Sequence, residues 1–163
     1  MIMKLSTFTD YSLRMLMYLA ARPLRRATIA EIASAFGISE NHLIKVAHGL
    51  GRKGWLTTVR GKGGGLELAV SPQHIGVGEV VRHTEGRDVP AACFADDSPP
   101  CAIVRVCRLR GVFAEAVDAF HAVLDGYTLA DLSRNPRALS SLLHIDPAPK
   151  VAAGRRRLGA LSA

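Results

Sequence analysis

Two adjacent capped helices joined by a glycine turn constrain the fold of this chain most strongly. In the first helix, Thr28 and Glu31 form the pattern of a capping box, and apolar residues follow at helical spacing. Gly37 ends this helix, because glycine adopts the left-handed C-terminal conformation without steric cost. Ser39 then caps a second helix that runs to about Gly51. Two helices with so short a junction have the layout of a helix-turn-helix.

Two short alternating segments follow this helix pair and predict a β-hairpin. Residues 55–60 and 66–70 alternate apolar and polar side chains, as half-buried strands do. The run Gly61-Lys62-Gly63-Gly64-Gly65 lies between them and predicts a basic, glycine-rich tip. A hairpin placed directly after a helix-turn-helix is a wing. The sequence therefore predicts a winged helix-turn-helix DNA-binding domain over residues 1–75.

Further helices are predicted on either side of this unit. A helix over residues 7–21 precedes it, with Thr7 and Asp10 spaced as a capping box. A short helix over residues 77–84 leads into a proline-containing loop, and a long helical pattern covers residues 101–125. The apolar stripe of the long helix is too wide for the small N-terminal core to cover. We therefore expect a partner subunit to bury it.

The predicted fold class is mainly α with a small β-hairpin: a winged helix-turn-helix plus a long C-terminal dimerisation helix. Residues 76–132 would hold the cysteine loop and the dimerisation helix. Residues 133–163 are rich in Ala, Pro and Arg, and we expect most of this basic tail to be disordered.

Charge and composition narrow the classes of function. The formal net charge is +7, from 21 Lys and Arg against 14 Asp and Glu, which favours a polyanionic partner. No apolar run of 18 residues and no secretory pattern occurs, so we expect a cytoplasmic protein without a membrane partner. The glycine-rich run opens no helix and lacks a following Lys-Ser/Thr pair, so it is not a nucleotide site. No nucleophile–base pair or substrate motif indicates an enzyme.

The second helix of the pair carries the side chains expected to read DNA. Recognition helices contact base edges from their N-terminal turns, where Asn pairs with adenine and Lys reaches guanine. Basic residues of the wing would enter a minor groove or grip the backbone. The expected DNA contacts are Thr28, Ser39, Glu40, Asn41, His42, Lys45, His48, Arg60 and Lys62. Each helix residue could instead be an ordinary solvated side chain.

Three cysteines lie within fifteen residues, as Cys93, Cys101 and Cys107, and the chain has no others. The odd number excludes complete internal pairing, and neither the spacing nor the count suits a structural zinc site. Soft thiolates suit an iron–sulfur cluster, which we expect to be 4Fe–4S in preference to 2Fe–2S. Three free thiols on a loop are the alternative. A fourth ligand is missing from the cysteine set, and the candidates are Asp10, His83, Glu85, a water or a small thiol.

These motifs resemble the family of winged-helix iron–sulfur regulators that includes NsrR, IscR and RirA. The resemblance spans roughly residues 3–132 and rests on the opening Lys4-Leu5-Ser6-Thr7-Phe8-Thr9-Asp10-Tyr11, on Ile38-Ser39-Glu40-Asn41-His42-Leu43, on the wing and on the three cysteines. Asn41-His42-Leu43 and Arg82-His83-Thr84-Glu85 look most similar to the NsrR type, a nitric-oxide-sensing repressor. Arg110 stands where IscR-type proteins use histidine, so the resemblance disfavours an IscR-type ligand set.

The resemblance implies a homodimeric repressor that binds a double-stranded operator and responds to nitric oxide through its cluster. It also implies that Asp10 supplies the fourth ligand across the dimer, whereas the residues alone fit a helix N-terminal role equally well. The seven residues between Cys93 and Cys101 are shared with RirA-like regulators, so an iron- or redox-responsive regulator remains an alternative. An iron–sulfur electron carrier is an alternative of another class.

Overall fold

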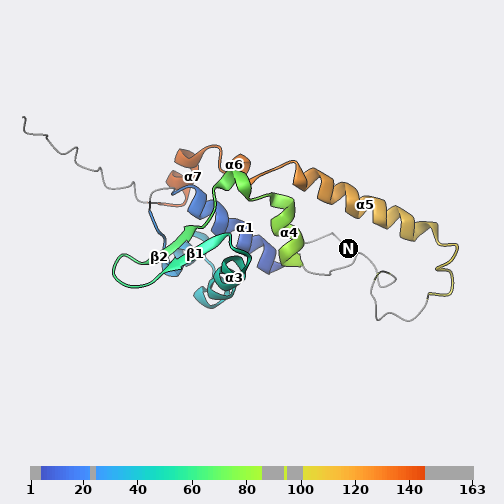
Figure 1. Cartoon of the computed structure of the whole chain (residues 1–163), viewed down its shortest axis with the longest axis horizontal. Coiled ribbons are helices and arrows are strands. Elements are labelled where there is room, and N and C mark those ends of the chain that lie inside the picture. Colours follow the sequence, from blue (N-terminus) through green and yellow to red (C-terminus); the bar gives the residue numbers. More distant parts are fainter. Residues whose placement is uncertain (1–4, 23–24, 86–93, 95–100, 146–163) are drawn as a thin grey trace, which may run out of the picture.

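The computed structural model describes residues 5–22, 25–85, 94 and 101–145 (Figure 1). In this part of the chain, no helix is long and apolar enough to cross a membrane. The elements in chain order are α1 (Thr7–Ala20), α2 (Ile29–Phe36), α3 (Glu40–Lys53), β1 (Leu56–Val59), β2 (Gly65–Leu68), the 3-10 turn η1 (Pro72–His74), α4 (Val77–Glu85), α5 (Arg108–Asp125), α6 (Leu129–Leu132) and α7 (Pro136–Leu142).

Local sequence signals set the ends of the first three helices. The Thr28–Glu31 capping box is present at the start of α2, and Gly37 is left-handed with φ 64°. Ser39 occupies the N-cap of α3, which continues two residues beyond the predicted end before left-handed Gly54 stops it. The capping prediction for α1 is wrong by one residue, because Ser6 is the N-cap and its hydroxyl accepts the Thr9 N–H.

The two strands form an antiparallel hairpin that is extended on one side by a backbone bridge. Leu56 pairs with Leu68 and Val59 pairs with Gly65. Ala27, in the connection between α1 and α2, exchanges two hydrogen bonds with Leu66 at 3.0 and 2.7 Å. The hairpin is thereby fixed to the helical body at Leu66, directly after its glycine-rich tip.

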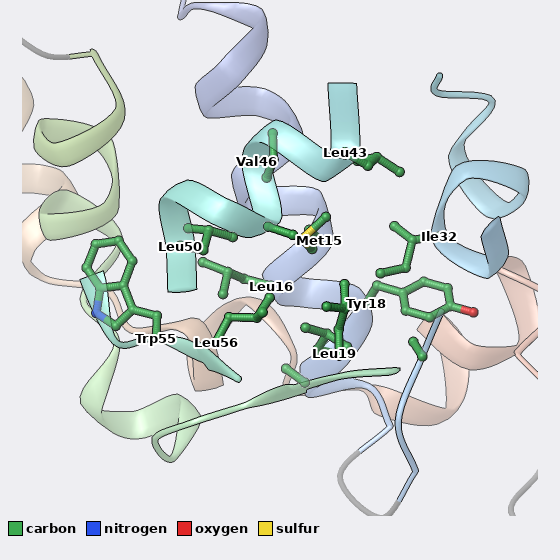
Figure 2. Close-up of a cluster of buried hydrophobic side chains, with 14 of the residues drawn as sticks. Met15, Leu16, Tyr18, Leu19, Ile32, Leu43, Val46, Leu50, Trp55 and Leu56 are labelled. Atoms are coloured by element: carbon green, nitrogen blue, oxygen red, sulfur yellow. The ribbon is translucent and has the colours of Figure 1, made fainter. Parts of the chain in front are cut away.

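A single apolar core lies among α1, α2, α3 and the hairpin (Figure 2). Met15 and Leu16 of α1 are fully buried, and they meet Leu43 and Leu50 from α3. Trp55 closes one side of this core at the start of the hairpin. Together with the wing, the three helices form the predicted winged helix-turn-helix.

The helix α5 extends away from this body and differs in length from the prediction. It begins at Arg108 with Cys107 as its N-cap, whereas residues 101–106 form turns instead of the predicted helix. Near its other end, Arg82 of α4 donates to both Asp125 carboxylate oxygens at 3.0 and 2.6 Å. None of its residues is buried, so its apolar stripe is uncovered in the single chain.

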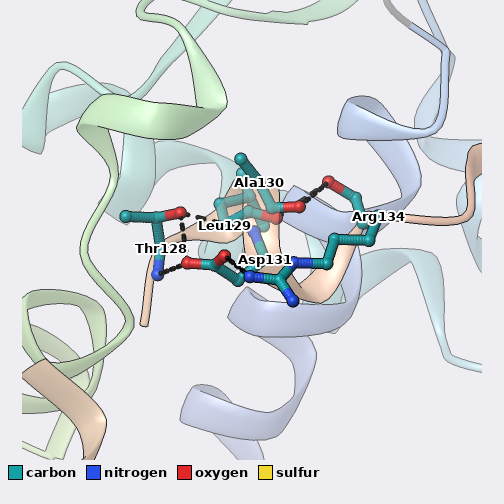
Figure 3. A network of polar contacts seen from close by, with 6 residues as sticks. Thr128, Leu129, Ala130, Asp131 and Arg134 are labelled. Atoms are coloured by element: carbon teal, nitrogen blue, oxygen red, sulfur yellow. Dashed lines mark hydrogen bonds and ion pairs between the residues drawn. The ribbon is translucent and has the colours of Figure 1, made fainter. Parts of the chain in front are cut away.

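Two further short helices follow α5. Thr128 and Asp131 form a capping box at α6, and Arg134 pairs with Asp131 (Figure 3). These contacts, the Thr128 N–H bond first, lower the pKa of Asp131 to about 2. The helix α7 and the buried Ile145 follow, so residues 133–145 of the segment expected to be mostly disordered are ordered. Residues 146–163 lie outside the described part of the chain.

Candidate nucleic-acid interface and cysteine site

The exposed side of α3 carries the predicted recognition residues. The opposite side is buried in the core through four apolar residues, Leu43, Val46, Ala47 and Leu50. This burial leaves the polar side chains of the N-terminal turns in solvent. All of the residues predicted on this helix are exposed, namely Ser39, Glu40, Asn41, His42, Lys45 and His48.

Two side chains on this helix were missed by the sequence reasoning. Ile44 is 53% exposed among the polar residues, where an apolar group suits contact with a thymine methyl. Arg52 is exposed in the last turn and adds positive charge. An exposed apolar residue within an otherwise polar helical face was the available signal for Ile44.

The helix α1 supports α3 from behind. The Tyr11 ring lies 6.0 Å from the His42 ring, centre to centre. Phe8 lies so close to Gly49 that a Cβ at that position would come 3.0 Å from its ring. These contacts link the N-terminal half of α1 directly to the recognition helix.

The wing presents its basic residues at the end of the hairpin. Arg60 and Lys62 are both exposed. Gly61 and Gly63 adopt φ values of 92° and 78°, which favour glycine in this tight turn. The glycine-rich run therefore forms the tip itself and leaves room for a close approach by a partner.

The start of α2 lies beside the wing and is held by a buried arginine. Arg22 donates to the Glu31 carboxylate at 3.3 Å and to the Tyr18 hydroxyl at 3.2 Å. Burial raises the pKa of Glu31, but hydrogen bonds from Thr28 and the charge of Arg22 outweigh it and hold the pKa below its ordinary value. Thr28 is exposed at this end, and the neighbouring Arg25 and Arg26, which the sequence reasoning missed, are exposed too.

The described cysteines lie at the two ends of a turn segment before α5. Cys101 is exposed and Cys107 is half-buried, and both are free thiols. Backbone hydrogen bonds from Val104 to Cys101 and from Val106 to Ile103 fold the segment between them. Cys93 lies outside the described residues, within which no cluster of three His, Cys, Asp or Glu side chains forms. Two soft thiols on one exposed turn fit the donor chemistry of an iron–sulfur cluster.

Each protein residue considered as a fourth ligand has a contact of its own in the single chain. Asp10 pairs with Arg14 at 2.9 Å, and both side chains are almost half exposed. Glu85 accepts the Ser6 N–H at 2.8 Å, and the His83 ring packs edge-on against Trp55. Solvent reaches His83 as well as Asp10, and Asp10 lies in the first turn of α1.

Comparisons with known proteins agree with this geometry. The model of the Rrf2 family, described as an iron-dependent transcriptional regulator, matches residues 5–135. The HTH-type transcriptional regulator NsrR of Bacillus subtilis (strain 168) is 47% identical over 142 residues, which are 86% of this chain and 97% of that protein. NsrR of Geobacillus kaustophilus (strain HTA426) is 46% identical, with the same shares covered.

Two solved structures are similar to this fold. CymR (YrzC), the global cysteine regulator of B. subtilis, has a TM-score of 0.66 and 28% identity, and the match covers 82% of this chain and 98% of that one. T. potens IscR has a TM-score of 0.63 and 27% identity, and the match covers 82% of this chain and 88% of that one.

Proposed function

The chain belongs to the Rrf2 family of transcriptional regulators, and from this premise we propose that it is a homodimeric repressor whose operator binding is controlled by an iron–sulfur cluster that reacts with nitric oxide. As a member of this family it is a DNA-binding transcriptional regulator and not an enzyme. Action on DNA implies a cytoplasmic location for the proposed repressor.

The proposed DNA contacts are those predicted from the sequence. The recognition helix α3 would insert its exposed N-terminal turns, with Asn41, His42 and Lys45, into a major groove. The wing residues Arg60 and Lys62 would contact the adjacent minor groove or backbone. A symmetric dimer would then read two half-sites separated by about 34 Å, one helical turn.

The uncovered face of α5 supports the homodimer. Leu109, Val112 and Val123 are each more than half exposed on this helix, as are Ile103 and Val106 in the preceding turn. Burying a Val or Leu side chain completely contributes about 1.5–3 kcal/mol. A second copy of α5 presents the same apolar stripe, so the two helices can cover each other.

The observation that carries the cluster proposal is the position of the thiols beside this face. Cys101 and Cys107 lie at the start of α5, and Cys93 would complete the set. When bound, an iron–sulfur cluster supplies iron that reacts with nitric oxide. The fourth ligand would be Asp10 of the partner subunit, because Asp10 is accessible and its Arg14 pair is an exposed one. The 4Fe–4S type, and DNA binding by the cluster-loaded form, are parts of the same proposal.

Anaerobic purification and cysteine substitution test this function. The protein is expected to be coloured by iron and sulfide, and Cys93→Ala, Cys101→Ala and Cys107→Ala should each abolish the visible absorption. Asp10→Ala should weaken or alter it, and Arg14→Ala, which frees the carboxylate of Asp10, is the matched control. Nitric oxide should release the loaded protein from a selected operator duplex. If the colourless, cluster-free protein binds the operator as tightly as the loaded protein, a cluster does not regulate DNA binding.

An iron-responsive regulator of the RirA type is the second candidate. The family description as iron-dependent and the seven-residue Cys93–Cys101 spacing favour it. Parallel titrations of the protein–DNA complex with an iron chelator and with nitric oxide separate the two signals. A nitric-oxide sensor should release DNA at less than one nitric oxide per protein, before any iron is removed. No finding favours the electron-carrier alternative, because the similar proteins are named transcriptional regulators.

A further inference from the structure

The Arg26 side chain connects the α1–α2 segment to the wing. Its Nε donates to Glu67 Oε2 at 2.8 Å, and its Nη1 donates to the Gly63 carbonyl at 3.4 Å. Glu67 lies in β2 and Gly63 lies in the hairpin tip. One guanidinium therefore contacts both a strand and the tip of the wing.

Gly63 and Gly64 of the tip line a hollow, whereas Gly65 packs against Arg26 and Ala27. A groove of about 960 Å³ runs along this side, and its lining includes Arg22, Arg26, Gly63 and Glu67. The backbone bridge between Ala27 and Leu66 fixes the strand directly after the tip, and Gly63 lies three residues before that bridge. Among hydrogen bonds of the described residues, the one from Arg26 to Gly63 joins the tip to another element.

We propose that the Arg26–Glu67 pair positions the wing, so that it sets the direction in which Lys62 and Arg60 meet DNA. This inference rests on the proposed function, in which the wing contacts the operator. Both side chains of the pair are about 40% exposed. Exposed ion pairs contribute little to folding stability. We therefore expect loss of this pair to change the orientation of the tip and not the free energy of unfolding. Arg26 is a positioning residue and needs no DNA contact of its own.

Glu67 makes this role distinguishable from simple charge attraction. Removing its negative charge makes the protein more basic and frees Arg26, so electrostatics alone predicts tighter DNA binding. Loss of wing positioning predicts weaker binding. Arg25 is the matched control for Arg26, because it is adjacent, exposed and equally charged, and in the described residues its side chain makes no hydrogen bond to the wing.

The test is a set of binding titrations with anaerobically purified protein and a DNA duplex of about 30 base pairs, a length that holds two half-sites one turn apart. The duplex is first selected from a randomised library by binding to the wild-type protein. Glu67→Gln and Arg26→Gln should each weaken binding by about twofold to fivefold, the range for coupling through an exposed ion pair. The exchange Arg26→Glu with Glu67→Arg should restore most of the affinity. Lys62→Ala should weaken the wild type more than it weakens Arg26→Gln, because the displaced tip no longer delivers Lys62.

Unchanged thermal unfolding should accompany these losses. Glu67→Gln binding as tightly as the wild type, or more tightly, would overturn the inference, as would an Arg25→Gln loss equal to that of Arg26→Gln. If Lys62→Ala and Arg60→Ala both bind like the wild type, the wing does not contact DNA. That result removes the proposed wing contacts and the inference together, whereas a harmful Lys62→Ala with a harmless Glu67→Gln removes the inference alone.

Discussion

Thr28→Ala is expected to lower both the stability of the protein and its affinity for DNA, because Thr28 caps α2 and is a proposed DNA contact. The Thr28 hydroxyl accepts the Glu31 N–H at 3.1 Å and lies 3.1 Å from Glu31 Oε2. The substitution removes both contacts and keeps the 2.6 Å bond from the Thr28 N–H to the Glu31 carboxylate. Loss of an N-cap hydroxyl costs about 1 kcal/mol. In a chain of this size, that cost lowers the Tm by roughly 2–4 °C. Affinity for the selected operator duplex should also fall.

Thr128→Ala is the matched control for this prediction. Thr128 forms the same kind of capping box with Asp131, and its hydroxyl accepts the Asp131 N–H at 3.3 Å. In Figure 1, α6 and α3 lie on opposite sides of α1, so α6 is away from the predicted DNA face. Thr128→Ala should therefore lower the Tm similarly, measured by circular dichroism, and leave DNA affinity unchanged. Equal losses of affinity in both variants would refute the Thr28 contact, and an unchanged Tm of Thr28→Ala would refute the capping argument.

Three further outcomes are expected. Val112→Glu should convert the dimer to a monomer in sedimentation, because a charge would enter the apolar stripe of α5. Asp118→Lys should not, because Asp118 lies about 120° from Val112 around the helix, outside that stripe. A Val112→Glu variant that stays dimeric would contradict the α5 interface. Leu50→Ala should cost about 2–5 kcal/mol in urea unfolding, because Leu50 is fully buried, and a smaller loss would mean that the core closes over the gap. The lowered pKa of Asp131, about 2 against 3.8 when unfolded, stabilises the fold above pH 4, and this contribution is lost as the pH falls toward 2. Asp131→Asn should flatten the dependence of Tm on pH in that window, and an unchanged slope would exclude the contribution.

Local patterns made the helix-turn-helix predictable, and distant contacts limited the rest. Thr28, Glu31 and Gly37 act within one helix, so their roles follow from spacing alone. The contact of Arg26 with Glu67 joins residues 41 positions apart, and no periodicity marks it. The exposure of the predicted α3 residues followed from the buried stripe on the same helix. Their contacts with DNA depend on docking, which neither the sequence nor a single chain contains.

The structure differs from simple expectation at α5 and adds detail at α7, for different physical reasons. Apolar spacing over residues 101–106 suggested helix, but Ile103 and Val106 are exposed, so no core in the single chain enforced that period. In α7 the signal was present, because Asn135 caps the helix and Pro136 occupies its first turn. Composition outweighed that signal in the prediction of a disordered tail. A local capping pattern was therefore more reliable than the average character of its segment.

The regulator proposed for this chain needs a physical connection between its cysteine loop and its recognition helix, and α4 has the required contacts. Its last residue, Glu85, accepts the Ser6 N–H and lies eight residues before Cys93, while Thr84 and Thr9 share a 2.7 Å hydrogen bond. These bonds fix the first turn of α1, which supports α3 through Phe8 and Tyr11. Thr9 is fully buried, so solvent cannot take the place of Thr84 as a hydrogen-bond partner. A displacement of the end of α4 therefore either moves α1 as well or leaves the Thr9 hydroxyl with Ser6 as its remaining side-chain partner. The end of α4 and the DNA-reading surface are thus connected through α1, and breaking the Thr9–Thr84 contact would cost free energy.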